Sequence, residues 1–156
     1  MAESLDVRSI FERHHLGVFR YLRRILGSSA DAEDLTQETF LRVMRGLPGY
    51  RPDGREAAWV YEIARNLALN RRRDVARRPA IQSAIPEIPN TAPPQVELQQ
   101  ALSTLPDLDR DCFLLRESGG LGYAEIAAAC GITEDAVRSR IHRARTALRA
   151  ALAGTR

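Results

Sequence analysis

A proline-rich stretch in the middle of the chain rules out one continuous array of helices. The seventeen residues Pro79–Gln95, PAIQSAIPEIPNTAPPQ, hold five of the eight prolines and no positive charge. Proline removes a backbone donor and clashes inside a helix, and this stretch has no sustained apolar period, so it predicts a linker. At the polyproline rise of about 3.1 Å per residue, it can span roughly 50 Å and hold two modules apart.

This linker predicts two small domains, at residues 1–78 and 96–156, joined through residues 79–95. Hydrophobic residues make up 44% of the 156 positions, which is typical of a folded chain. Both flanking blocks space their apolar residues three and four apart, and neither has a sustained period of two. We therefore expect an all-α protein whose two helical domains are joined by a flexible linker.

The apolar spacing predicts seven helices, and Asp31 is the expected cap of the second. The predicted helices cover residues 4–26, 31–47, 55–78, 96–105, 107–118, 123–130 and 135–149.

The last two predicted helices have the pattern of a helix-turn-helix. Gly131 lies in the turn, and Thr133 is the expected cap of the final helix. Arginine forks match guanine edges and phosphates, so the polar side of this helix is predicted to enter a major groove. The alternative is a solvated basic face on a structural helix. The apolar seam consists of Val137, Ile141, Ala144 and Leu148, and the DNA-binding candidates are Arg138, Ser139, His142, Arg143 and Arg145.

The third predicted helix and the loop before it combine aromatic, amide and arginine side chains. Aromatic rings stack on unpaired bases, amides bond to base edges and arginines hold the backbone, so this composition favours single-stranded DNA. In the alternative interpretation, Trp59 belongs to the core and the arginines form a solvated helix end. Four of the candidates, Arg65, Asn66, Arg72 and Arg73, are expected to point away from the core. The full set is Tyr50, Trp59, Arg65, Asn66, Asn70, Arg72 and Arg73.

The second predicted helix differs because its outer face is acidic and apolar as well as basic. Asp34, Glu38 and Leu41 share this face with Arg42 and Arg45. Acidic groups repel phosphate, so an exposed leucine among these charges indicates a protein partner. The alternative is a solvated face stabilised by the Glu38–Arg42 spacing.

Composition and motifs argue against an enzyme. All 23 cationic side chains are arginine, the net charge is +3 and the pI is about 9.3. The sequence has no glycine-rich phosphate loop, no HExxH motif and no Ser/His/Asp arrangement whose spacing suggests a catalytic triad. We therefore expect no catalytic residue, cofactor, metal or small-molecule substrate. Cys112 and Cys130 are expected to be small buried hydrophobes. No signal peptide or membrane-length apolar run is present, which predicts a cytoplasmic protein without membrane insertion.

Three segments together resemble the extracytoplasmic-function (ECF) sigma factors, RNA polymerase specificity subunits of the sigma-70 family. DAEDLTQETFLRVMR resembles region 2.2 of that family, and AWVYEIARNLALNRRRDVARR resembles regions 2.3 and 2.4. LPDLDRDCFLLRESGGLGYAEIAAACGITEDAVRSRIHRARTALR resembles region 4. The resemblance covers nearly the whole chain.

The resemblance implies a role for each predicted surface. Region 2.2 would bind the clamp helices of the polymerase β′ subunit through Asp34, Gln37, Glu38 and Leu41. Residues 50–73 would melt the −10 promoter element and hold a flipped base, chiefly through Asn66 and Asn70. Region 4 would dock on the β flap and read the −35 element, and an anti-sigma factor would be a further partner.

Two other functions remain open from the sequence. The chain could be a stand-alone helix-turn-helix repressor or activator, with its first block used for dimerisation or sensing. A nucleic-acid enzyme is a weaker alternative, because no metal-binding set is visible. The sigma-factor hypothesis requires that Asn66 and Arg143 are not both packed inside the fold.

Overall fold

The computed structural model describes residues 6–51, 53–77 and 93–153. All regular elements in these ranges are helices, which confirms the all-α prediction. Residues 79–92, most of the predicted linker, lie outside the described residues.

The first half contains three α-helices and a short 3-10 turn, whose bounds are α1 Val7–Leu26, α2 Ser29–Gly46, η1 Leu47–Gly49 and α3 Glu56–Arg77. At the start of α2, the hydroxyl of Ser28 accepts a hydrogen bond from the backbone N–H of Asp31 at 3.2 Å. Ser28 is therefore the cap, and the prediction of Asp31 was wrong. Asp31 instead lies in the first turn, where a negative charge suits the helix dipole.

The second half contains α4 Pro93–Ser103, α5 Asp107–Glu117, α6 Tyr123–Cys130 and α7 Glu134–Ala153. Helix α4 begins at Pro93, inside the predicted linker 79–95. Proline is tolerated there because the N–H groups of a first helical turn have no acceptor within the helix. Between α6 and α7, Gly131 has a φ of 69°, a left-handed value that favours glycine. The Thr133 hydroxyl accepts from the backbone N–H of Ala136 at 3.1 Å, so the predicted cap is confirmed.

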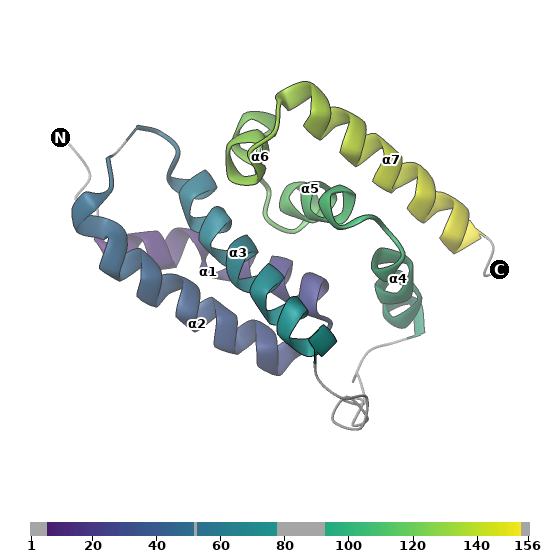
Figure 1. Cartoon of the computed structure of the whole chain (residues 1–156), viewed down its shortest axis with the longest axis horizontal. Coiled ribbons are helices and arrows are strands. Elements are labelled where there is room, and N and C mark those ends of the chain that lie inside the picture. Colours follow the sequence, from purple (N-terminus) through teal and green to yellow (C-terminus); the bar gives the residue numbers. More distant parts are fainter. Residues whose placement is uncertain (1–5, 52, 78–92, 154–156) are drawn as a thin grey trace.

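The two halves lie in direct contact (Figure 1). Helices α1, α2 and α3 pack together, α7 packs on α4, α5 and α6, and the halves meet where α3 contacts α6 and α1 contacts α5. Buried apolar side chains from both halves form one continuous cluster, which includes Tyr21, Tyr61, Leu115 and Ile126. The two halves that the sequence predicts as separate modules therefore share one apolar cluster in this structure.

The predicted apolar seam of α7 is confirmed as part of this cluster. Val137, Ile141, Ala144 and Leu148 are all at most 5% exposed. Burying a large aliphatic side chain contributes about 1.5–3 kcal/mol, so this seam fixes the rotation of α7 about its axis. Among the described residues, no helix combines the length and apolar character required to cross a membrane.

Candidate nucleic-acid interface

Helix α7 presents a polar face opposite its buried seam. Arg138, Ser139, His142 and Arg143 are exposed on this face, and Arg145 is half-buried beside them. All five predicted duplex-binding residues therefore lie on the second helix of a helix-turn-helix. In such motifs the N-terminal residues of the second helix contact base edges.

Asp109 on α5 binds one arginine of α7 tightly and leaves another exposed. The Asp109 side chain is 5% exposed and accepts a hydrogen bond from Nη1 of Arg140 at 3.0 Å. Arg143 Nη2 lies 3.6 Å from the same carboxylate, but the Arg143 side chain remains 58% exposed. Arg140 therefore fastens α7 to α5, whereas Arg143 is accessible to a ligand.

Tyr123, at the start of α6, orients one of the candidate arginines. The guanidinium carbons of Arg116 and Arg138 lie 5.0 Å and 5.3 Å from the centre of its ring. Cations over an aromatic face are attracted by its quadrupole, so the ring restrains Arg138 before any ligand arrives. Sequence analysis missed Tyr123, because no spacing rule connects it with residues on the next helix.

The candidates on α3 divide into two groups. Trp59, Asn66, Asn70 and Arg73 lie on one side of the helix, which we call the outer stripe of α3; Trp59 is half-buried and the other three are exposed. Arg65 and Arg72 instead face the second domain. Both arginines point away from the apolar stripe of α3, as expected, but they meet acidic residues of the other domain, which a helical wheel of α3 cannot show.

The contacts of Arg65 and Arg72 are with acidic residues of α5. Arg65 Nε donates to Oδ2 of Asp111 at 2.9 Å, and Arg72 Nη1 donates to Oδ1 of Asp107 at 3.1 Å. Both guanidinium groups therefore have carboxylate partners in the other domain.

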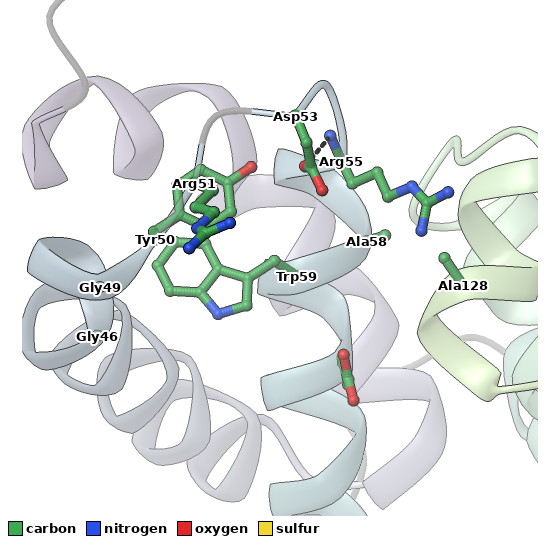
Figure 2. A pocket seen from close by; sticks show the side chains of 10 residues that line it. Gly46, Gly49, Tyr50, Arg51, Asp53, Arg55, Ala58, Trp59 and Ala128 are labelled. Atoms are coloured by element: carbon green, nitrogen blue, oxygen red, sulfur yellow. Dashed lines mark hydrogen bonds between the residues drawn. The ribbon is translucent and has the colours of Figure 1, made fainter.

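A stacked pair of aromatic rings lies where the η1–α3 loop meets α3 (Figure 2). The rings of Tyr50 and Trp59 have centroids 4.2 Å apart and planes 12° apart. They line an open hollow of about 340 Å³ together with Arg51 and Arg55, and Figure 2 shows Arg55 extending toward Ala128 of α6. Asp53 and Glu62 line it as well, so the hollow offers aromatic surface and charges of both signs beside the outer stripe of α3.

The hydroxyl of Tyr50 is unsatisfied within the described part of the chain. Its oxygen is buried and has no hydrogen-bond partner there. Burial, together with the negative charges of Asp53 and Glu56, raises the pKa of Tyr50. The phenol therefore keeps its proton at neutral pH and can donate a hydrogen bond.

Glu56 anchors the end of this loop to α1. Its carboxylate accepts from Nε and Nη2 of Arg13 at 2.9 Å and 2.6 Å, and it lies 2.7 Å from Nε2 of His14. Hydrogen bonding from Arg13, and from His14 as well, lowers the pKa of Glu56 despite the opposing effect of burial. Sequence analysis did not identify this cluster, because its members are more than forty positions apart.

Helix α2 carries the predicted protein-binding face. Asp34, Gln37 and Leu41 are exposed there and Glu38 is half-buried, so the four candidates do share an outer surface. Glu38 accepts from Arg42 at 3.2 Å, and Asp34 accepts from Arg71 of α3 at 2.7 Å. Leu41 is 42% exposed and Met44 is 49% exposed, which adds an apolar residue that the prediction did not include.

The fold and these surfaces define a two-domain helical protein with a helix-turn-helix and a second surface that combines aromatic, amide and arginine side chains. Comparison with protein families agrees with this class. Residues 10–78 match the Sigma-70 region 2 family, and residues 95–148 match the Sigma-70 region 4 family.

Whole-chain comparisons give the same family. SigE of Mycolicibacterium smegmatis, an ECF RNA polymerase sigma factor, is 39% identical over 92% of this chain, which spans 60% of the length of SigE. SigL of Mycobacterium tuberculosis, also an ECF RNA polymerase sigma factor, is 32% identical over 97% of this chain and 91% of its own length. The chain belongs to the ECF family of RNA polymerase sigma factors, whose role is in transcription initiation.

Solved structures share the fold. The sigma factor RpoE, in complex with the anti-sigma factor NepR from Bartonella quintana, superposes with a TM-score of 0.77 at 22% identity, covering 96% of this chain and 98% of RpoE. CnrH, in complex with the cytosolic domain of CnrY, has a TM-score of 0.74 at 26% identity, covering 95% of this chain and 88% of CnrH.

Proposed function

We propose that this chain binds core RNA polymerase and directs it to promoters by reading a −35 duplex and opening a −10 element. Residues 1–78 act as the region 2 domain and residues 96–156 as the region 4 domain. The observation that carries the proposal is the presence of two different DNA-compatible surfaces, one on each family-matched domain. Because polymerase and chromosome are its partners, the chain works in the cytoplasm.

Duplex recognition is assigned to α7. Arg138 and Arg143 carry forked donors that match the acceptor pair of guanine in the major groove, and Ser139 and His142 lie between them. Arg145 Nη2 donates to Glu117 at 3.0 Å, and both side chains stay partly exposed, so Arg145 is suited to a phosphate at the edge of the groove. Duplex DNA is the ligand because α6 supports α7 as in a helix-turn-helix.

Opening of the −10 element is assigned to the hollow at Tyr50 and Trp59 and to the outer stripe of α3. Extruding a base costs a few kcal/mol, and capture of that base offsets the cost. Aromatic stacking accounts for about 1–3 kcal/mol per base, and the rings of Tyr50 and Trp59 provide the aromatic surface here. Asn66 and Asn70 can bond to base edges, while Arg73 holds the phosphate backbone.

Binding to polymerase is assigned to the outer face of α2, formed by Asp34, Gln37, Glu38 and Leu41. Carboxylates here repel DNA and match a basic partner surface, such as the clamp helices of the β′ subunit. Exposed Leu41 and Met44 provide apolar area that a protein partner would bury. The second domain would dock on the β flap.

An anti-sigma factor is the proposed regulatory partner. The support comes from two solved relatives with the same fold: RpoE was solved with the anti-sigma factor NepR and CnrH with the cytosolic domain of CnrY. Such a partner would cover the polymerase-binding and DNA-binding surfaces of this chain.

Run-off transcription tests the proposed function. Purified chain is added to bacterial core polymerase on a library of promoter fragments, and transcripts are mapped at their 5′ ends. The expected result is transcripts that start at a fixed distance from a shared −35 and −10 pair and require both components. Tight sequence-specific duplex binding by the chain alone, without transcripts, would instead identify a stand-alone repressor or activator.

A further inference from the structure

The second domain contains both cysteines of the chain, Cys112 and Cys130, and the proposed function uses neither of them. Both are free thiols. Cys112 lies in the middle of α5 and is fully buried, as the sequence predicts for a small hydrophobe. Cys130 is the last residue of α6 and is only half-buried. The pair therefore combines one partly accessible cysteine with one that is closed to solvent.

The two thiols contact each other. Helices α5 and α6 pack together, and a hydrogen bond joins the side chains of Cys112 and Cys130. Cys130 also packs against the buried apolar cluster that includes Cys112. A disulfide forms where the Cβ atoms of two cysteines approach closely and their sulfur atoms point toward each other. Because these sulfurs are already hydrogen-bonded neighbours, a small change in side-chain torsions brings them to bonding distance.

The two thiols differ in reactivity. The hydrogen bond to Cys130, together with burial, raises the pKa of Cys112. The same hydrogen bond lowers the pKa of Cys130, and the guanidinium of Arg65 on α3 lowers it further. Burial and the negative charges of Asp111 and Glu62 oppose this shift without reversing it. The thiolate is the nucleophilic form of cysteine, so Cys130 is the member of the pair that attacks an oxidant.

We propose that Cys112 and Cys130 form a reversible disulfide within the chain, with hydrogen peroxide as the oxidant. First, the sulfur of Cys130 attacks one peroxide oxygen, so that an S–O bond forms, the O–O bond breaks and the leaving hydroxide takes up a proton to become water. The sulfur of Cys112 then attacks the sulfur of Cys130. An S–S bond forms, the S–O bond breaks, and the leaving hydroxide takes the Cys112 proton as a second water. One peroxide is reduced by two electrons and two thiols are oxidised.

This disulfide would act on the domain that carries the helix-turn-helix. Cys130 directly precedes Gly131, whose left-handed backbone forms the turn into α7. Asp109, one turn before Cys112 on α5, holds Arg140 of α7. The disulfide would therefore tie α6 to the helix that already holds α7. A cross-link also restricts the unfolded chain, so the oxidised domain should resist unfolding more strongly than the reduced one.

The bond is suited to a temporary response. In a reducing compartment, disulfides are transient and are often used to sense oxidants. Thiol–disulfide exchange with a small thiol would return Cys112 and Cys130 to their reduced forms. The oxidised form would therefore persist only while peroxide is present.

Peroxide treatment of the full, reduced chain tests the site. The chain is oxidised at low protein concentration, remaining thiols are alkylated, and the product is measured by intact mass and by peptide mapping without reductant. We expect an unalkylated species about 2 Da lighter than the reduced chain, the mass of two hydrogen atoms, with the peptides of Cys112 and Cys130 joined. Dithiothreitol should restore both thiols. The midpoint of urea denaturation should be higher for the oxidised chain.

Single substitutions separate the two roles. In C112A, no second thiol attacks oxidised Cys130, so a dimedone adduct of its sulfenic acid should accumulate. In the matched variant C130A, the buried Cys112 should react about tenfold more slowly or less. Peroxide should leave the urea midpoint of both variants unchanged. Mapping of the wild type decides the proposal even if C112A does not fold.

Three results would each overturn the proposal. The treated wild type could keep both thiols, the disulfide could join two chains instead of two helices of one chain, or C130A could be oxidised as fast as C112A. None of these measurements uses DNA or polymerase. Failure of the proposed function is therefore distinguishable, because it would appear as absence of promoter-specific transcripts with wild-type chain and core polymerase.

Discussion

Helices α3 and α7 are similar in length and composition but differ in what covers them. They have 22 and 20 residues, and each carries several arginines opposite a buried seam. The second domain covers Arg65 and Arg72 on α3, whereas the polar face of α7 points to solvent along its length. The difference teaches that charge on a helix defines a candidate surface, but the neighbouring domain decides which of its residues are accessible.

The largest expected effect concerns the anchorage of α7. Ile141→Ala deletes a side chain that is 1% exposed, and we expect the free energy of unfolding to fall by about 2–5 kcal/mol. Urea denaturation followed by circular dichroism measures this loss. The exposed neighbour Thr146→Ala should change stability by less than about 0.5 kcal/mol. Equal effects of the two substitutions would show that the seam does not hold α7.

The next effect tests the availability of the polar face of α7. Arg143→Ala should weaken −35 recognition by holoenzyme by about 1–3 kcal/mol and leave core binding unchanged. The control is Arg149→Ala, which removes the same charge from the C-terminal part of the helix, away from the end that contacts bases. Competition binding with promoter fragments measures both. If Arg143→Ala weakens core binding equally, this residue serves the fold rather than DNA.

A smaller effect is expected on the outer stripe of α3. Asn66→Ala removes hydrogen bonds to base edges worth about 0.5–1.5 kcal/mol, so opening of the −10 element should decrease while −35 binding is retained. Fluorescence of 2-aminopurine placed in the −10 element measures opening. Ala76→Ser, exposed on α3 outside the stripe, is the control. Unchanged opening in Asn66→Ala would exclude Asn66 from strand capture.

The smallest effect concerns the anchor of the loop that precedes α3. The folded state lowers the pKa of Glu56, so this residue stabilises the fold at pH values above its usual pKa of 4.5. The contribution is lost as the pH falls through the lowered pKa of the folded state. Glu56→Gln should therefore be less stable than the wild type at pH 7, with a difference that shrinks toward pH 3. Urea denaturation at several pH values measures it. A difference that stays constant with pH would contradict this role of Glu56.

Much of the fold was predictable because apolar spacing records the core of each helix. The seam of α7, the helix-turn-helix and the cap at Thr133 all follow from local pattern. The cap of α2 was misassigned to Asp31, because both serine and aspartate near the start favour capping and only geometry selects Ser28.

The candidate interface was predictable where a residue's environment is set by its own helix. Asn66 and Arg143 are exposed as the sigma-factor hypothesis requires. The partners of Arg65 and Arg72, the ring of Tyr123 between two arginines and the Glu56 cluster were not predictable, because each depends on how distant helices meet. Sequence periodicity contains no information on contacts between helices that are distant in the chain.

The most direct test of the account is a footprint of the holoenzyme on one promoter with the wild type, Arg143→Ala and Asn66→Ala. DNase protection reports −35 contact, and permanganate reactivity of thymines reports −10 opening. We expect Arg143→Ala to lose −35 protection and Asn66→Ala to lose −10 reactivity while keeping −35 protection. Loss of both signals to the same extent in both variants, with normal core binding, would contradict a division of promoter recognition between two separate surfaces.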